Sequence, residues 1–192
     1  MRRVFISILL LAGMTFSAAT QENSMWIGGT LSLTGEDNGQ TRSTTTIMPE
    51  LGYNINQAWA IGGRVGFTTD RTVQQGNTRR ENTTSIIPFA RYTFGDVAGF
   101  QVFGQGEMPL HFFGGNHYDG TSMDGSNSIG LAVRPGVSYS FTERWGFNML
   151  MPSVLSIVST GDGNSSYALG INDGYTIQRY LLSTSIGFIY MF

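Results

Sequence analysis

The stretch Tyr180-Leu-Leu-Ser-Thr-Ser-Ile-Gly-Phe-Ile-Tyr-Met-Phe192 decides the fold, because apolar and polar side chains alternate along it. Such alternation is the signature of a β-strand with two different faces. One face carries Tyr180, Leu182, Thr184, Ile186, Phe188, Tyr190 and Phe192. The other carries Ser183, Ser185 and Gly187, with Leu181, Ile189 and Met191 as exceptions.

Seven further segments alternate in the same way, which brings the expected strands to eight. They cover residues 25–33, 47–55, 59–67, 83–94, 100–110, 129–141 and 145–157. Three are less regular. Trp26 falls opposite the apolar face of the first, Ile87 and Phe89 share the parity of Arg91, and the seventh becomes apolar on both faces around Pro152.

The composition of the 192 residues limits the fold class. Charged residues are 12% of the chain, about half of the roughly 25% typical of soluble domains. The 13 Phe, 8 Tyr and 3 Trp argue against a disordered chain, which has few aromatics. No apolar run in the body of the chain approaches the roughly 20 residues of a membrane helix. An all-β sandwich or barrel remains, either soluble or in a membrane.

The N-terminus has the layout of a secretory signal peptide. Met1-Arg-Arg is followed by an apolar stretch over residues 4–16 and by Ser17-Ala-Ala19. We therefore predict a signal peptide over residues 1–19 and a barrel domain over residues 20–192. Cys is absent, so no disulfide or thiolate metal site is expected.

The expected connections alternate in length. Long polar stretches cover residues 35–43, 69–82, 114–127 and 159–179, whereas tight turns cover residues 56–58, 95–99 and 142–144. Long loops at one end and short turns at the other are typical of a barrel in the bacterial outer membrane.

Five charged residues fall inside the expected strands, and each lies on the face opposite the apolar one. A charge facing lipid at the midplane costs roughly 2–4 kcal/mol for Arg, so these side chains are expected to point into the lumen. There they can pair with one another and replace a hydrophobic core, with Gly, Ser and Thr filling the remaining space. An ion path or a gate is the alternative. The predicted lumen charge network is Glu50, Arg64, Arg91, Glu107 and Arg134.

Aromatic residues flank the short turns. The pattern Tyr-x-apolar-x-x-x-Trp occurs at residues 53–59 and 139–145, and Tyr92-Thr-Phe94 repeats its first half. Aromatic side chains at one height form the girdle where hydrocarbon meets headgroups. The predicted girdle is Tyr53, Trp59, Tyr92, Phe94, Tyr139, Phe141 and Trp145.

Several stretches resemble small eight-stranded outer-membrane β-barrel proteins of the OmpA/OmpX-like, porin-family class. The resemblance is carried by residues 52–63 and 135–147, by Pro88-Phe-Ala-Arg-Tyr-Thr-Phe94 and by Gly187-Phe-Ile-Tyr-Met-Phe192. It covers nearly the whole mature chain. It implies that Phe188, Tyr190 and Phe192 form a signal read by the barrel-assembly machinery, and that Arg and Glu pair in the lumen.

The sequence predicts no catalytic residue, cofactor or metal site. His111 and Glu107 share the inward face of one strand, and His117, Asp119 and Ser122 follow in the next loop. They leave a membrane-embedded hydrolase as an alternative, although no motif surrounds either His. Asp119, Asp124, Asp162 and Asp173 could offer oxygen ligands to Ca²⁺, but Asp-Gly and Asn-Gly sequences favour turns.

We therefore expect an all-β, eight-stranded, antiparallel up-and-down transmembrane β-barrel in the bacterial cell outer membrane. Its expected role is structural, in the envelope, or surface interaction with an extracellular ligand at the loops. A narrow pore or gated channel is the alternative. The expected partners are outer-membrane lipid and, during biogenesis, the barrel-assembly machinery. Nucleic acid is not expected, because the chain has no Lys and no basic patch, and the barrel is expected to be a monomer.

Overall fold

The computed structural model describes residues 25–37, 41–74, 76–161, 163–170 and 184–192. The expected signal peptide lies outside these residues, as do Tyr180 and Leu182 of the last expected strand. The described residues contain no helix that is long and apolar enough to cross a membrane.

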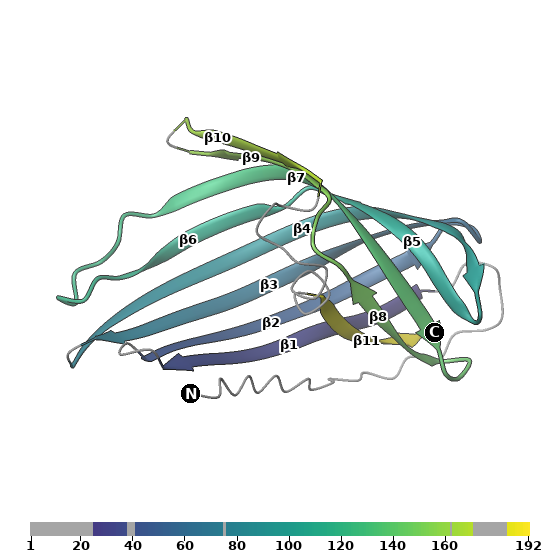
Figure 1. The fold of residues 1–192 in the computed structure, drawn as a ribbon, viewed down its shortest axis with the longest axis horizontal. Helices are drawn as coiled ribbons and strands as arrows, with labels where there is room; N and C mark the ends of the chain where they lie inside the picture. The colour runs from purple at the N-terminus through teal and green to yellow at the C-terminus, as the bar shows by residue number, and fades with distance from the viewer. Residues whose placement is uncertain (1–24, 38–40, 75, 162, 171–183) are drawn as a thin grey trace.

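All regular structure in the described residues is β-strand (Figure 1). The strands are β1 (Met25–Asp37), β2 (Thr41–Asn54), β3 (Trp59–Gln74), β4 (Asn77–Val97), β5 (Phe100–Glu107), β6 (Leu110–Asn116), β7 (Ser126–Ser140), β8 (Trp145–Leu150), β9 (Leu155–Thr160), β10 (Ser165–Leu169) and β11 (Ser185–Met191).

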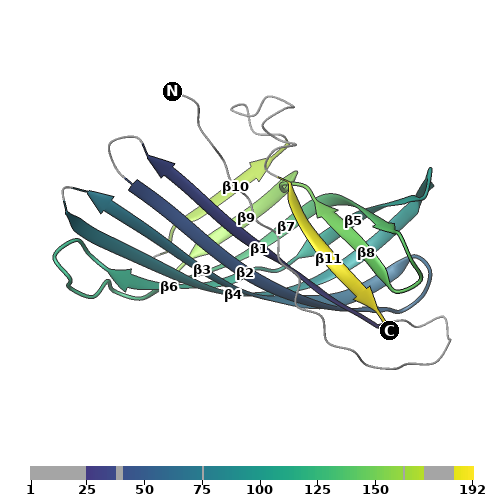
Figure 2. The same ribbon diagram turned by 90° about the horizontal axis from the view of Figure 1, so that it is seen from below.

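Eight of these strands close a ring of antiparallel hydrogen bonds. The order is β1–β2–β3–β4–β5–β7–β8–β11, and β11 pairs with β1. Figure 2 shows β11 lying between β1 and β8, which is the position where the ring closes. The predicted fold class, an eight-stranded antiparallel barrel, is confirmed.

Two expected strands are each divided in the structure. The fifth breaks at Met108 and Pro109, and β6 continues it between β4 and β7. The seventh breaks at residues 151–154, and β9 continues it along β7. A proline lies in each break, at Pro109 and Pro152. Proline has no backbone N–H to donate to a strand ladder, so it favours an interruption of the strand.

Two of the four expected long loops, at residues 35–43 and 69–82, are largely wrong. Residues 117–125, between β6 and β7, form a loop as expected, and residues 171–179 of the last expected loop lie outside the described residues. Most of residues 35–43 and 69–82 belongs to β1–β2 and β3–β4, which pair continuously up to Asp37↔Thr41 and Gln74↔Asn77. Within residues 159–179, β10 pairs with β9. The polar composition of these stretches is typical of loops. A strand that extends above the bilayer, however, meets water on its outer face and needs no apolar side chains there.

The tight turns share one end of the barrel with the described C-terminus. Phe192 N donates to Met25 O at 2.9 Å, so the two ends of the barrel sequence meet there. In the turn after β2, Asn56 Oδ1 accepts hydrogen bonds from the amides of Ala58 and Trp59. In the turn after β7, Thr142 Oγ1 accepts hydrogen bonds from the amides of Arg144 and Trp145. The sequence repeat at residues 53–59 and 139–145 therefore encodes one turn geometry used twice.

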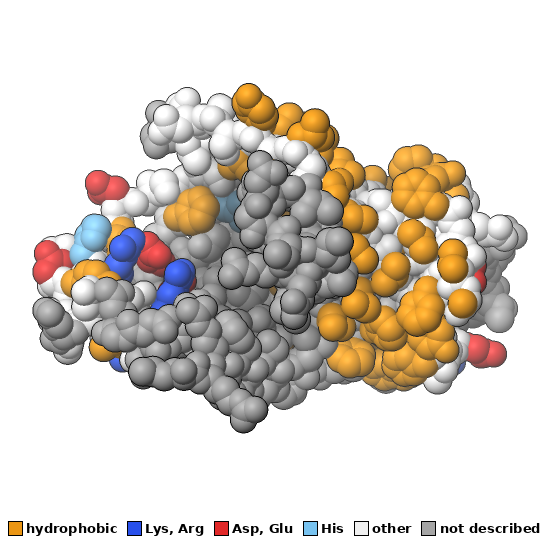
Figure 3. Space-filling view, in the orientation of Figure 1, with side chains coloured by type: hydrophobic (Ala, Val, Ile, Leu, Met, Phe, Trp, Pro, Cys, Tyr) orange, Lys and Arg blue, Asp and Glu red, His pale blue; other side chains and the backbone are white. Residues whose placement is uncertain are grey.

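The two faces of the strands differ as the alternation predicts. Along β4, Ser85, Ile87, Phe89 and Arg91 are buried while the residues between them are exposed. Large apolar side chains cover much of the outer face, and charged side chains gather mainly at the end reached by the β3–β4 hairpin (Figure 3).

The interior differs from the expectation that Gly, Ser and Thr fill the space around the charges. Trp26, Phe89 and Ile189 form an apolar cluster inside the ring, with Met191 packed against it. Phe103 is also inside and is only 1% exposed. Ile189 and Met191, the exceptions in the C-terminal alternation, therefore fill part of the interior.

Inward glycines make room for these rings. A Cβ on Gly52 would lie 2.1 Å from the indole of Trp26, and one on Gly136 would lie 2.4 Å from the ring of Phe103. Each aromatic ring occupies the place that a side chain on the neighbouring strand would take.

Candidate functional site

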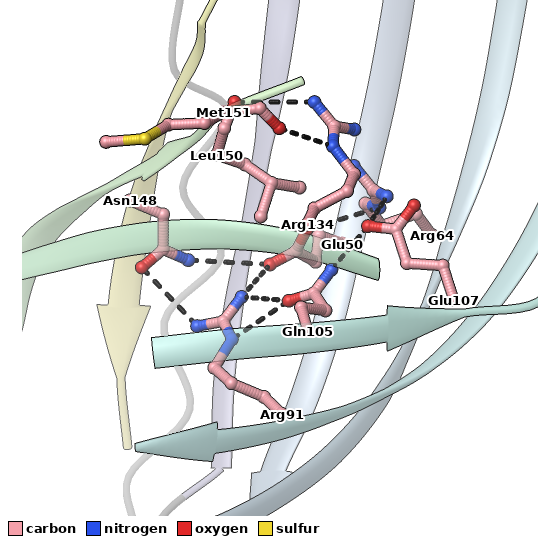
Figure 4. Close-up of polar contacts among 9 residues, drawn as sticks. All are labelled: Glu50, Arg64, Arg91, Gln105, Glu107, Arg134, Asn148, Leu150 and Met151. Carbon is pink, nitrogen blue, oxygen red and sulfur yellow. Dashed lines mark hydrogen bonds and ion pairs between the residues drawn. The ribbon is translucent and has the colours of Figure 1, made fainter. Parts of the chain in front are cut away.

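The middle of the lumen holds the predicted charges. Register explains how they meet, because Glu50 on β2 is the direct partner of Arg64 on β3, and Arg91, Gln105 and Arg134 follow one another across β4, β5 and β7. Inward parity then brings these side chains together inside the barrel (Figure 4).

Arg64 links the two acidic residues. Its Nη2 lies 2.5 Å from Glu107 Oε1, and its Nε lies 3.6 Å from Glu50 Oε2. The side chains of Arg64 and Glu107 are 6% and 4% exposed, so this ion pair is almost fully removed from solvent. A buried charge needs such a partner, since an unpaired one costs several kcal/mol.

Arg91 binds the other side of Glu50. Its Nη2 lies 3.4 Å from Glu50 Oε1, and its Nε and Nη2 donate to Gln105 Oε1 at 2.9 and 2.8 Å. Gln105 Nε2 in turn donates to Glu107 Oε1 at 2.8 Å. Two Arg and two Glu therefore form one connected, charge-balanced network.

The guanidinium of Arg91 also packs on aromatic rings. Its Cζ lies 4.1 Å from the ring centroid of Phe103, 4.9 Å from that of Trp26 and 5.6 Å from that of Phe89. A delocalised guanidinium is weakly hydrated and stacks well on aromatic faces. We call Trp26, Phe89, Arg91 and Phe103 the lumen plug.

Arg134 lies at the edge of the network. Its Nε donates to Met151 O at 2.7 Å and its Nη2 to Leu150 O at 3.3 Å, at the point where β8 ends. It thereby binds carbonyl oxygens at the break between β8 and β9.

Sequence reasoning missed Gln105, Asn148 and the aromatic members of the plug. Gln105 is completely buried, and Asn148 lies 3.5 Å from both Arg91 Nη1 and Glu50 Oε1. The alternation of the strands could have identified them, since Phe103, Gln105 and Asn148 all occupy inward-facing positions. Charge alone does not single them out, because all three side chains are neutral.

The space on the turn side of the plug is small and polar. It has a volume of about 60 Å³ and is bounded by Trp26, Arg91, Gln101, Ser138 and Asn148, among others. A cavity of this size accommodates a few water molecules but no larger solute.

His111 lies half-buried on the inward side of β6, on the other side of the network. Its Nδ1 is 2.7 Å from Oγ of the buried Ser85 on β4. Asp119 closes a turn in the loop after β6, where its Oδ1 accepts from the amide and hydroxyl of Thr121 at 2.9 and 2.6 Å. These hydrogen bonds lower the pKa of Asp119.

The sequence favours turns over Ca²⁺ ligation for the Asp-Gly and Asn-Gly stretches of the loops. Among the described residues, no group of three or more His, Asp or Glu side chains is placed to hold a metal ion. Asp162 and Asp173 lie outside the described residues.

The residues of the predicted girdle flank the tight turns. Trp59 contacts Tyr92 with ring centroids 4.9 Å apart, and Tyr92 contacts Phe94 at 5.3 Å. Tyr139 packs against Phe100 and Phe147, two aromatics that the prediction left out. Tyr53 and Phe141 are exposed at the same end, and Trp145 contacts Tyr190.

The predicted assembly signal lies beside this girdle. The ring centroid of Tyr190 is 4.9 Å from that of Trp145 and 5.3 Å from that of Phe192. Tyr190 is buried, whereas Phe188 and Phe192 are partly exposed. Phe192 therefore remains accessible at the end of the barrel.

Comparison with known proteins gives one finding on the family. Residues 6–151 match the family described as "Outer membrane protein beta-barrel domain". No curated protein matches the chain.

Proposed function

The chain belongs to the family of outer membrane protein β-barrel domains, and from this membership we propose that it is a closed, non-enzymatic envelope protein. In this role the barrel anchors its extended hairpins at the cell surface and contributes to the integrity of the outer membrane. The lumen charge network replaces a hydrophobic core and is not a transport path.

The lumen plug is the observation that carries this proposal. Phe103 of the plug is 1% exposed and Gln105, which binds Arg91, is 0% exposed, so neither inward side chain borders open, water-accessible space. The network around Arg91 is charge-balanced and internally hydrogen bonded, which leaves little driving force for an ion to enter.

A bilayer conductance measurement tests the proposal. The wild-type barrel is expected to give no current above background in planar lipid bilayers. The double variant Trp26→Ala/Phe103→Ala removes two walls of the plug and is expected to conduct, which shows that the assay detects an open lumen. Wild-type conductance that disappears in Glu107→Ala would establish the narrow pore or gated channel instead.

The membrane-embedded hydrolase remains the less favoured alternative. The short contact between Ser85 and His111 supports it, but both side chains face the lumen, away from the lipid that such an enzyme would cleave. His111→Ala is expected to leave the acyl-chain pattern of outer-membrane lipids and the surface peptides unchanged. A changed lipid or peptide profile would favour the hydrolase.

A further inference from the structure

Two arginines face outward on the β3–β4 hairpin, directly opposite each other. The register pairs Arg71 with Arg80. Both are exposed, and they share parity with the outward residues Phe67 and Ile86 further down the same strands. Directly opposed side chains on one face have Cβ atoms about 5 Å apart, so like charges there repel.

The charges on the other face of the same hairpin are all paired. Arg42 forms an ion pair with Asp70, and Arg79 forms one with Glu81. By contrast, Arg71 and Arg80 form no ion pair or side-chain hydrogen bond with any side chain that the structure describes, a set that leaves out Glu36 and Asp37. Among the described side chains, the inward charges of the hairpin are therefore neutralised, and its two outward arginines have no counter-charge.

The neighbouring strands carry no acidic residue on the row of the two arginines or on the row below it, and Asp37 belongs to the row above, on β1. Across the sheet, the row through the two arginines reads Gly35, Ser43, Arg71, Arg80 and Asn116. The row below it reads Leu33, Thr45, Thr69, Asn82 and Gly114. Hydroxyl and amide groups therefore surround the two guanidinium groups, and such groups can donate further hydrogen bonds to an anion.

The position of Arg71 and Arg80 relative to the apolar face indicates which kind of anion they would meet. Apart from Leu33 and Val73, the outward apolar face on β1, β2, β3 and β6 ends at a row that contains Ile47, Phe67 and Phe112. Arg71 lies four residues above Phe67, which is about 13 Å along a strand and about 10 Å along the membrane normal at the usual tilt of ~40°. This places both guanidinium groups at the level of lipid headgroups, at the end opposite the tight turns.

We propose that Arg71 and Arg80 form a binding site for the phosphate of a phosphorylated glycolipid in the outer leaflet. Guanidinium groups bind phosphate oxygens through bidentate, charge-assisted hydrogen bonds. One phosphate between the two arginines removes their mutual repulsion, while the acyl chains of the lipid cover the apolar face around Phe67 and Phe112. The site rests on the location in the outer membrane and is independent of whether the lumen conducts.

Lipid binding by the refolded barrel tests the site. The protein in detergent micelles is titrated with a bisphosphorylated glycolipid and with the same glycolipid after dephosphorylation, and bound lipid is counted by native mass spectrometry. The bisphosphorylated lipid is expected to bind at least tenfold more tightly and to raise the unfolding temperature, since a ligand that binds only the folded state stabilises it. Equal binding of the two lipids would overturn the proposal.

Matched variants assign the site to the two arginines. Arg71→Gln and Arg80→Gln are each expected to weaken binding of the bisphosphorylated lipid about tenfold, which corresponds to about 1.4 kcal/mol. Arg144→Gln removes an exposed arginine in a turn at the other end and is expected to bind like wild type. Unchanged binding by both Arg71→Gln and Arg80→Gln, with both variants shown to be folded by heat-dependent gel mobility, would refute the assignment.

A competition experiment separates the lipid from free phosphate. Inorganic phosphate at millimolar concentration is expected to leave lipid binding unchanged, because the acyl chains add apolar contacts that a free ion lacks. Displacement of the lipid by inorganic phosphate at this concentration would show a site for the soluble ion and would contradict the lipid assignment.

Discussion

At the scale of single residues, the lumen depends on small side chains lying opposite large ones. Gly52 faces the indole of Trp26, and a Cβ on Gly52 would come closer to that ring than van der Waals contact allows. Gly63, one strand away, faces outward, and a Cβ there would meet only Ile87 O at 4.0 Å. The two glycines therefore form a matched pair that separates packing in the lumen from backbone effects.

Gly52→Ala is expected to destabilise the barrel by about 1–3 kcal/mol, because the Trp26 ring or the β2 backbone must move. Gly63→Ala is expected to change stability by less than about 1 kcal/mol, since alanine adopts strand geometry at least as well as glycine. Urea unfolding in lipid vesicles, followed by tryptophan fluorescence, measures both. Equal stabilities of the two variants would mean that the ring does not occupy this position.

The ion pair of Arg64 with Glu107 allows a second residue-scale prediction. Glu107→Gln keeps the shape and an acceptor for Gln105, but it leaves the charge of Arg64 with only Glu50 at 3.6 Å. We expect a loss of about 3–5 kcal/mol in the free energy of unfolding, as for other buried pairs that lose one partner. Urea unfolding in lipid vesicles measures this loss as well.

The double variant Arg64→Gln/Glu107→Gln controls for the loss of the glutamate itself. Because it removes both charges, we expect it to be more stable than Glu107→Gln alone. If Glu107→Gln unfolds like wild type, water must reach the network and solvate Arg64, and the description of the lumen as closed would be wrong.

At the scale of elements, the β3–β4 hairpin shows what the sequence does not reveal. Residues 69–82 are polar on both faces, and this composition predicts a loop. In the structure, the hydrogen bond of Thr69 with Asn82 crosses from β3 to β4, and the ion pair of Arg42 with Asp70 joins β2 to β3. Both accompany a continuous ladder up to Gln74↔Asn77. Hydrophobic alternation detects only the part of a strand that faces lipid, so it locates the membrane-facing length of β3 and β4 and not their full length.

Asp70 makes the upper part of this element sensitive to pH. The hydrogen bond from Arg42 lowers the pKa of Asp70 from its ordinary value of 3.8. A depressed pKa in the folded state means that the interaction stabilises the hairpin fully at pH values above about 4. The contribution is lost as the pH falls through the folded-state pKa. We therefore expect amide exchange around Arg42 and Asp70 to accelerate as the pH falls below about 4, by more than the ordinary pH dependence of exchange.

Asp70→Asn is the control for this pH effect. It is expected to show weaker protection already at pH 7 and no additional loss of protection on acidification. Hydrogen exchange measured by mass spectrometry, with the carboxylate-free segment 129–140 of β7 as the internal reference, reports both. Acid-dependent loosening that persists in Asp70→Asn would trace the effect to another carboxylate.

At the scale of the whole molecule, alternation and charge parity are sufficient to predict the closed ring and the inward position of the five charges inside the expected strands. They cannot predict the contents of the lumen. Whether the barrel is open depends on which inward side chains share a level, and register between strands sets that level. Phe103 and Gln105 are distant from Arg91 along the chain and come next to it only after β4 and β5 are paired at Arg91↔Gln105. The network and the plug are therefore properties of the closed ring.

The C-terminal end of β11 allows the effect of Phe192 on folding to be separated from its effect on assembly in cells. The ring closes through β11, whose ladder with β1 and β8 uses backbone groups. Phe192 contributes its amide to Met25 O and its ring to a contact with Tyr190, and it is partly exposed. Phe192→Ala keeps the backbone hydrogen bond and removes only the terminal ring.

If Phe192 is read by the barrel-assembly machinery, Phe192→Ala should lower the amount of protein in the outer membrane severalfold in cells. The same variant should refold into detergent micelles with nearly the wild-type yield, as judged by the mobility of unboiled samples on SDS gels. Phe141→Ala, which removes an exposed aromatic ring at the same end of the barrel, is expected to assemble normally in cells. A parallel loss of assembly in cells and of refolding in micelles would mean instead that the Phe192 ring stabilises the seam. That result would be understandable, because its contact with Tyr190 continues to Trp145 on β8 and so spans the junction at which the ring closes.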